Sequence, residues 1–82
     1  MNTYTYTVLF ERFKDGDQEG YNVSVPALPE IVTWGQTLEQ ARANAGEAIA
    51  CVIESMMQNG EPLPADIQSE HVVYVEKMPV QA

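Results

Sequence analysis

One long helical pattern in the second half of the chain constrains the fold more than any other feature. From Leu38 to Gln58, apolar residues recur at steps of three and four, which predicts an amphipathic helix of about 20 residues, roughly 30 Å long. Thr37, followed three residues later by Gln40, is a capping box that marks the start of this helix. Asn59-Gly60 supplies a left-handed stop at its end, and two prolines follow. The remaining sequence must provide the sheet that covers the apolar side of the helix.

The predicted helix carries two apolar stripes. One stripe is expected to meet the sheet and contains Leu38, Ala41, Ala45, Ala48, Ile49, Val52 and Met56. A second stripe on another side contains Ala43, Gly46, Ala50, Ile53 and Met57. Alanine forms helices well and is tolerated on any surface, but small residues also allow close packing against another chain. Gly46 costs about 1 kcal/mol of helix propensity relative to alanine, which favours a contact at this position.

Alternating apolar and polar residues predict strands before and after the helix. The expected strands begin at Thr3 and then cover Tyr21–Val25, Ile31–Trp34 and His71–Lys77. The polar segment Lys14–Gly20 contains an Asp-Gly pair and ends in glycine, so it favours a hairpin whose two strands pair antiparallel. Pro26 ends the second strand, and Gly35 makes the turn that aims the helix.

Length and charge narrow the class of partner. A chain of 82 residues is expected to form one domain over residues 1–82, and it buries only about 60% of the surface that its unfolded form exposes. Self-association would extend so small a core. Four Lys and Arg against twelve Asp and Glu leave a net charge of −8, the opposite of a nucleic-acid binder. We therefore expect a basic protein partner and no direct binding to nucleic acid.

Cysteine content and hydropathy indicate a compartment. Cys51 is the only cysteine, which excludes an internal disulfide and a cysteine zinc site and is compatible with a reducing environment. The sequence has neither a secretory leader pattern nor an apolar run of membrane length. These features predict a cytoplasmic protein that does not bind membranes.

Catalytic, cofactor and metal sites receive no support from the sequence. Asp15–Gly20 imitates the start of a calcium-binding loop, but Pro26 stands at the twelfth position, where that loop needs a bidentate Glu. His71 has no second His or Cys at ligand spacing, and Cys51 has no basic neighbour to activate it. Neither a Gly-x-Ser-x-Gly motif nor a phosphate-binding glycine loop is present. We expect no catalytic residue, no cofactor and no metal.

Residues spread over most of the chain resemble the HicB antitoxin family. The resemblance runs from about Tyr4 to Pro64 and combines a Pro-x-Leu-Pro stretch, a Gly-x-Thr stretch and an alanine-rich helix. The matching positions are Gly20-Tyr21, Val25-Pro26, Leu28-Pro29, Thr33, Gly35, Thr37, Glu39, Ala41, Ala45, Glu47-Ala48-Ile49, Gly60, Pro62 and Pro64. Two positions depart from the family pattern, because Glu30 and Ile31 stand where glycine and cysteine are common.

The resemblance implies a small α+β domain similar to part of the ribonuclease H fold. Its order is β-β-β-α-β, with an antiparallel three-stranded sheet, a last strand parallel to the first, and one helix packed on one face. Ribonuclease H chemistry needs converging carboxylates that hold two metal ions, and here only Glu11 lies well inside a predicted strand. The resemblance in fold therefore implies no nuclease activity.

The same resemblance implies the antitoxin of a type II toxin–antitoxin pair, which binds and masks a small basic HicA-like ribonuclease toxin. Acidic residues and an aromatic anchor are the expected contacts with that toxin: Asp15, Asp17, Glu19, Glu30 and Trp34. Solvated loops, and a tryptophan that only covers the core, are the alternative interpretation. An orphan HicB-like protein-binding or oligomeric module without a toxin is the alternative function. Many family members carry a DNA-binding module after this domain, and we expect none here.

Self-association to a dimer or tetramer is also expected, by one of two routes. The helix route uses the second stripe. The edge route uses Ile31, Val32 and Thr33, provided that the third strand lies at a sheet edge with unpaired backbone groups. The edge route is favoured slightly, because alanine and glycine bury little apolar area per residue.

Overall fold

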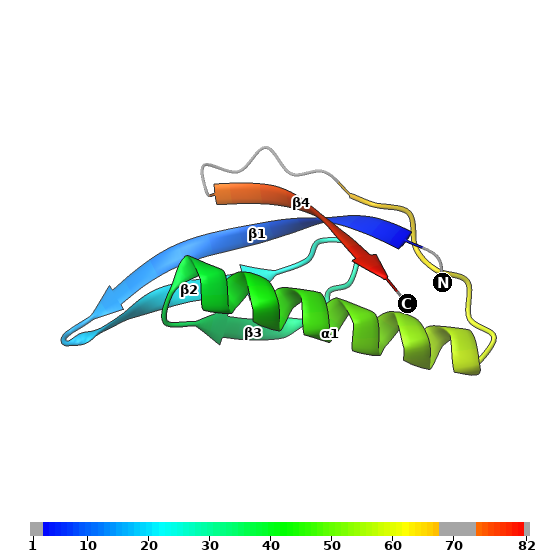
Figure 1. The fold of residues 1–82 in the computed structure, drawn as a ribbon, viewed down its shortest axis with the longest axis horizontal. Helices are drawn as coiled ribbons and strands as arrows, with labels where there is room; N and C mark the ends of the chain where they lie inside the picture. Colours follow the sequence, from blue (N-terminus) through cyan, green and yellow to red (C-terminus); the bar gives the residue numbers. More distant parts are fainter. Residues whose placement is uncertain (1–2, 68–73, 82) are drawn as a thin grey trace.

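A four-stranded antiparallel sheet with one helix across it forms this domain, as the computed structural model shows for residues 3–67 and 74–81. The elements are β1 (Thr3–Asp15), β2 (Gln18–Ser24), β3 (Val32–Gly35), α1 (Leu38–Gln58) and β4 (Tyr74–Gln81). The strand order is β3-β2-β1-β4, and α1 lies on one side of the sheet (Figure 1). The expected β-β-β-α-β order in a small α+β domain is therefore confirmed.

The last strand runs antiparallel to β1, so the expectation of a parallel last strand is wrong. β4 begins opposite Phe10 and ends opposite Thr3, against the direction of β1. It also extends further than the expected His71–Lys77; of that range, residues 71–73 lie outside the described residues. β4 contains Pro79, which is tolerated because this strand lies at the edge of the sheet.

The direction of β4 follows from the path of the chain after α1. The hydroxyl of Tyr6 donates a hydrogen bond to the carbonyl of Pro64 (2.7 Å). Thr7 donates to the carboxylate of Asp66 from both its backbone amide (2.8 Å) and its hydroxyl (2.7 Å). These bonds hold the connection beside the first half of β1, near the side on which α1 ends, and β4 then starts toward the other end of β1 (Figure 1). Such a path produces an antiparallel return instead of a crossover.

The hairpin between β1 and β2 is confirmed, with a tighter turn than the polar segment suggested. The ladder continues to the pair Asp15 and Gln18, which leaves two turn residues. Gly16, the first of them, has φ 62°, in the left-handed region that favours glycine. The side chains of Lys14 and Glu19 thus lie on paired strands and not in a loop.

Local signals place α1 where the sequence predicts it. The hydroxyl of Thr37 accepts a hydrogen bond from the amide of Gln40 (3.0 Å), while the side chain of Gln40 accepts from the amide of Gln36 (2.6 Å). At the other end Gly60 has φ 70°. Gly35 lets the helix approach β3 closely, since a Cβ at this position would lie 2.4 Å from the backbone nitrogen of Ala41.

The core lies between α1 and the facing side of the sheet, and the loop from β2 to β3 closes one end of it. Leu28 is fully buried in that loop and is held by short backbone hydrogen bonds to Val25 and from Ile31. The buried helix residues are Ala41, Ala45, Ile49 and Ile53. The sheet and the segments beside it contribute Tyr6, Val8, Phe10, Val23, Val25, Ala27, Ile31, Met78 and Val80.

The second stripe of the helix is covered in part by its own chain, which corrects the expectation for Ile53. This residue is fully buried in the core. Gly46 faces β4, where a Cβ would lie 3.6 Å from the methyl carbon of Met78. Arg42 pairs with Glu76 of β4 through two hydrogen bonds of 2.7 and 2.9 Å. Of the other stripe residues, Ala50 is half-buried against the core, whereas Ala43 and Met57 are exposed.

The third strand lies at the sheet edge, but it begins one residue later than expected. β3 is the outer neighbour of β2 and pairs with it over Val32–Gly35. Ile31 precedes the strand, and its side chain is only 5% exposed, so it belongs to the core. Among the residues assigned to the edge route, Val32 is therefore the one whose side chain is fully presented to solvent.

Candidate partner-binding groove

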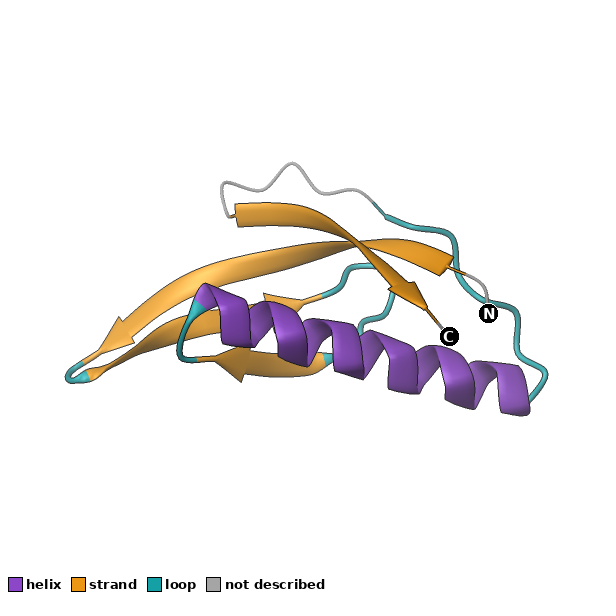
Figure 2. Ribbon diagram, in the orientation of Figure 1, coloured by secondary structure: helices purple, strands orange, loops and turns teal. Residues whose placement is uncertain are grey.

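The face of the sheet that points away from α1 carries exposed apolar side chains. On β3, Thr33 is paired with the buried Val23, so Val32 and Trp34 on either side of it point to the other face. Val32 is 89% exposed and Trp34 is 52% exposed. Figure 2 shows the single purple helix on one side of the sheet, and within the described residues no helix covers the opposite, outer face.

An aromatic pair spans three strands on this outer face. The ring centroids of Phe13 on β1 and Trp34 on β3 lie 6.3 Å apart, with 61° between the ring planes. Such an edge-to-face arrangement is favourable for two aromatic rings. Gly20 on β2 makes it possible, because a Cβ there would lie 3.2 Å from two carbons of the Phe13 ring and 2.6 Å from the carbonyl oxygen of Gly35.

The helix also contributes to the position of Trp34. The side-chain amide of Asn44 on α1 donates a hydrogen bond to the backbone carbonyl of Trp34 (2.8 Å). β3 is thus attached to β2 by its ladder and to α1 by this bond. The indole ring projects from a strand that is held on two sides, which suits a preorganised contact.

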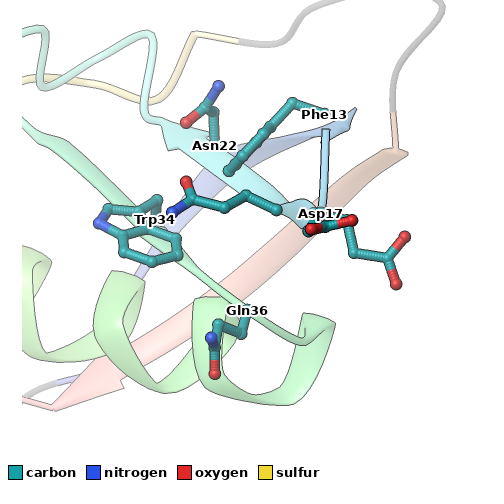
Figure 3. Close-up of a pocket in the computed structure, with 7 residues that line it drawn as sticks. Phe13, Asp17, Asn22, Trp34 and Gln36 are labelled. Carbon is teal, nitrogen blue, oxygen red and sulfur yellow. The ribbon is translucent and has the colours of Figure 1, made fainter. Parts of the chain in front are cut away.

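A groove of about 530 Å³ opens between the aromatic pair and the hairpin. Figure 3 shows Phe13, Asn22, Trp34 and Gln36 around it, with Asp17 from the hairpin turn. The complete lining is Phe13, Asp17, Gln18, Glu19, Asn22, Trp34 and Gln36. It therefore combines two rings, three carboxamides and two carboxylates, and no Lys or Arg of the described residues lines it.

One basic residue lies close to this groove without lining it. The guanidinium of Arg12 is 3.6 Å from the carboxylate of Glu19, and both side chains are more than half exposed (69% and 58%). An exposed pair of this kind contributes little to stability and is screened by salt. Arg12 also lines a smaller hollow of about 230 Å³ at the start of α1, together with Tyr21 and Leu38.

The structure brings together three of the five residues that the sequence proposes for partner binding. Asp17, Glu19 and Trp34 line the groove, while Asp15 ends β1 and Glu30 lies in the turn before β3, both outside the lining. The alternative that Trp34 only covers the core does not match its place on the outer face. The residues that the sequence analysis missed are Phe13, Gln18, Asn22 and Gln36. Continuing the alternation of the first strand past Glu11 would have found Phe13.

A second group of titratable residues has a structural role. Burial raises the pKa of Tyr6, and the neighbouring Asp66 carboxylate raises it further. Burial would also raise the pKa of Asp66, but hydrogen bonds from Thr7 and from the amide of Ile67, together with the charge of Lys77, outweigh it and hold this pKa below its usual value. The ionised Asp66 thus fastens the connection after α1 to β1.

Neither a metal cluster nor a membrane span is found in the part of the chain that the structure describes. No three His, Cys, Asp or Glu side chains among residues 3–67 and 74–81 are grouped so that they could hold a metal ion. His71, considered above as a ligand, lies outside these residues. The described helix is not apolar enough over a sufficient length to cross a membrane.

Fold and groove together define a small one-helix α+β domain with an open aromatic and acidic face. The chain belongs to the family of HicB-like antitoxins of bacterial toxin–antitoxin systems, whose model matches residues 6–79. The resemblance seen in the sequence is therefore confirmed. Members of this family are generally not enzymes.

Three relatives match most of this chain, and one of them is named as an antitoxin. A UPF0150 protein of Thermoplasma acidophilum is 41% identical over 69 residues, which cover 84% of this chain and 96% of that protein. A UPF0150 protein of Synechocystis is 40% identical over 63 residues, or 77% and 76% of the two chains. Antitoxin HicB 1 of Photorhabdus laumondii is 35% identical over 69 residues, or 82% of this chain but only 43% of that longer protein.

A solved structure supports the fold. The crystal structure of the N-terminal domain of Burkholderia pseudomallei antitoxin HicB matches with a TM-score of 0.76, covering 96% of this chain and all of that one. At 22% identity, this match concerns the fold alone.

Proposed function

We propose that this chain is the antitoxin of a type II toxin–antitoxin pair and that it binds and masks a small basic HicA-like ribonuclease in the cytoplasm. The observation that carries the proposal is the Phe13–Trp34 pair, which lies in an open groove on the uncovered face of the sheet. Large aromatic side chains of this kind supply much of the energy of protein interfaces. Family membership supports a toxin as the partner.

Electrostatics favour a basic partner. The chain has a net charge of −8, and the hairpin that borders the groove contributes Asp15, Asp17 and Glu19. Opposite charges across an interface accelerate diffusional encounter and exclude partners of the wrong sign. An acidic domain placed over the basic, RNA-binding surface of a ribonuclease would keep RNA away from it without any chemical step.

A second candidate, an oligomeric module without a toxin, is favoured by the edge of β3. Within the described residues this strand has a neighbour on one side only, and Val32 leaves an apolar side chain exposed on its outer face. Pairing of two such edges would join the sheets of two copies. An antitoxin could also self-associate through β3, so self-association does not distinguish the two functions. The antitoxin and the oligomeric module differ only in whether a toxin partner exists.

The proposal requires a short gene for a basic protein beside this one, and it is tested by coexpressing the two. The antitoxin should restore growth. Reversing the hairpin charges with Asp15→Lys, Asp17→Lys and Glu19→Lys together should slow association and reduce its dependence on salt, because steering charges act mainly on the association rate. The matched control is Glu39→Lys, Glu47→Lys and Glu54→Lys, three exposed positions on α1.

Two results would count against this function. The oligomeric module would be the better assignment if no basic protein is encoded beside this gene, or if such a protein forms no complex with this chain and growth is not rescued. An equal loss of association rate in the hairpin variant and in the α1 control would show that only net charge matters, and it would remove the hairpin from the interface.

A further inference from the structure

The groove is lined by groups that accept hydrogen bonds around an aromatic surface. Asp17 and Glu19 offer carboxylates, which only accept, and Gln18, Asn22 and Gln36 each offer a side-chain carbonyl oxygen beside an NH2 donor. The aromatic surface is Trp34, with Phe13 set against it edge to face. A group that only donates hydrogen bonds, carries positive charge and has a flat apolar face would match all of these features.

The exposure of Trp34 leaves room for such a group. The side chain is 52% exposed although Phe13 packs against it, so a large part of the indole faces solvent. The face of an indole attracts a cation placed within about 6 Å of the ring, and tryptophan is the best aromatic residue for this interaction. Arginine fulfils the geometric requirement better than lysine, because its guanidinium is planar and stacks on aromatic rings.

Charge argues against the other flat ligand, a nucleobase. A base could stack on Trp34, but its phosphates would approach a hairpin that carries Asp15, Asp17 and Glu19 on a chain of net charge −8. Arg12 partly neutralises Glu19 from outside the groove. Asp17 is the other carboxylate of the lining, and it comes from the hairpin turn.

We propose that this groove takes an arginine side chain of the protein partner. The guanidinium stacks on Trp34 and donates hydrogen bonds to the carboxylate of Asp17 and to the carboxamide oxygens of the lining, while Phe13 supports the indole from the side. The inference rests on the proposed function, because it names the part of a basic toxin that enters the antitoxin.

The test uses a capped Gly-Arg-Gly-Arg-Gly peptide as the probe, at low salt. Trp34 is the only tryptophan, so its fluorescence reports directly on the groove. We expect saturable binding of the arginine peptide, weaker binding of the lysine peptide, and about tenfold weaker binding of the citrulline peptide, which keeps the shape but lacks the charge. Equal affinity for arginine and citrulline peptides, or tighter binding of a short single-stranded RNA, would overturn the proposal.

Variants locate the bound peptide. Asp17→Asn should weaken arginine-peptide binding severalfold, whereas Glu30→Gln removes the same charge from an exposed position outside the groove and should have a smaller effect. Trp34→Leu removes the fluorescent group, so its peptide binding is measured by calorimetry. This variant should bind no arginine peptide, while its circular dichroism spectrum should show that the domain is still folded. If Asp17→Asn and Glu30→Gln behave alike, or if Trp34→Leu binds normally, the arginine does not occupy this groove.

The outcomes separate this inference from the proposed function. If Trp34→Leu and Asp17→Asn form the toxin complex as well as the unmodified chain does, the antitoxin role is retained and the arginine site is wrong. If the arginine peptide binds as described but no basic protein partner is found, the arginine site is retained and the assignment to a toxin is wrong.

Discussion

The two faces of the sheet are built from the same alternating strands, yet they have opposite surroundings. On the inner face, Val8, Phe10 and Val23 are covered by α1 and nearly inaccessible to solvent. On the outer face, Val32 and Trp34 remain exposed, although they are comparable in hydrophobicity. Burial of a large apolar side chain contributes about 1.5–3 kcal/mol, so the outer residues forgo most of that stabilisation in the isolated chain. The inner face makes the fold stable, and the outer face is available for contact with another molecule.

The outer face is itself divided. Toward the start of β1, Thr7 lies on the same face as Leu9 and Phe13, yet it is only 1% exposed. The connection after α1 covers it, because Asp66 accepts hydrogen bonds from its amide and hydroxyl. Toward the hairpin, no such segment of the described chain covers Phe13 and Trp34. Antiparallel sheets commonly have one polar, solvated face. Here an aromatic pair occupies that face, which is the reason for assigning it to a partner.

The largest effect expected from this comparison is the difference in stability between a truncation on α1, in the core that covers the inner face, and a truncation on the outer face. Ile49→Ala removes a fully buried side chain and should lower the free energy of unfolding by about 2–5 kcal/mol. Val32→Ala should change it by less than about 0.5 kcal/mol, because its side chain is already in water. Urea denaturation of both variants measures this. At a protein concentration low enough to keep the chain monomeric, similar losses in the two variants would contradict the exposure of Val32 in the single chain.

The parts of the fold that depend on short stretches were predictable from the sequence. The limits of α1 were predicted correctly, because Thr37, Gln40 and Gly60 act within one turn of the helix ends. The direction of β4 was not, since it depends on a contact between Thr7 and Asp66, which lie 59 positions apart. The burial of Ile53 was missed for a related reason: with β4 beside α1, a wider side of the helix is covered than one stripe.

The groove was predicted in part. Trp34, Asp17 and Glu19 stand out by residue type, because a single tryptophan and a run of acidic residues are visible without any fold. Phe13, between Arg12 and Lys14, continues the alternation of the first strand, but it directly precedes the polar segment that was expected to be a loop. Its meeting with Trp34 depends on Gly20 in the intervening strand, a contact that becomes apparent only from the strand register.

A smaller effect concerns the covered half of the outer face and depends on pH. The pKa of Asp66 is lowered in the folded chain, so this group stabilises the fold above its unfolded pKa, and the stabilisation is lost as the pH falls through the folded value. Asp66→Asn should lower stability near pH 7 by about 1 kcal/mol, since a charge-assisted hydrogen bond is replaced by a neutral one. The difference from the unmodified chain should shrink as the pH falls through the folded pKa of Asp66, because the carboxyl group is then neutral as well.

Thermal unfolding between pH 2 and pH 7 checks this prediction, with Glu30→Gln as a control that removes an exposed carboxylate. The control should follow the unmodified chain more closely than Asp66→Asn does across the whole range. A gap between Asp66→Asn and the unmodified chain that stays constant down to pH 2 would contradict the role of the ionised carboxylate.

The smallest expected change in stability, and the sharpest test of the open face, is Val32→Lys at the edge of β3. Its side chain is 89% exposed, so the monomer should unfold at nearly the same denaturant concentration as before. A charge on an edge strand opposes pairing with a second edge, and two lysines brought together there would repel each other. Light scattering at micromolar concentration should therefore show a dimer or larger species for the unmodified chain and a single chain for Val32→Lys.

The matched control is Ala43→Lys on the exposed side of α1, which tests the helix route and should leave the oligomer intact. Dissociation by Ala43→Lys alone would move the interface to the helix, and a single-chain mass for the unmodified protein would remove self-association altogether.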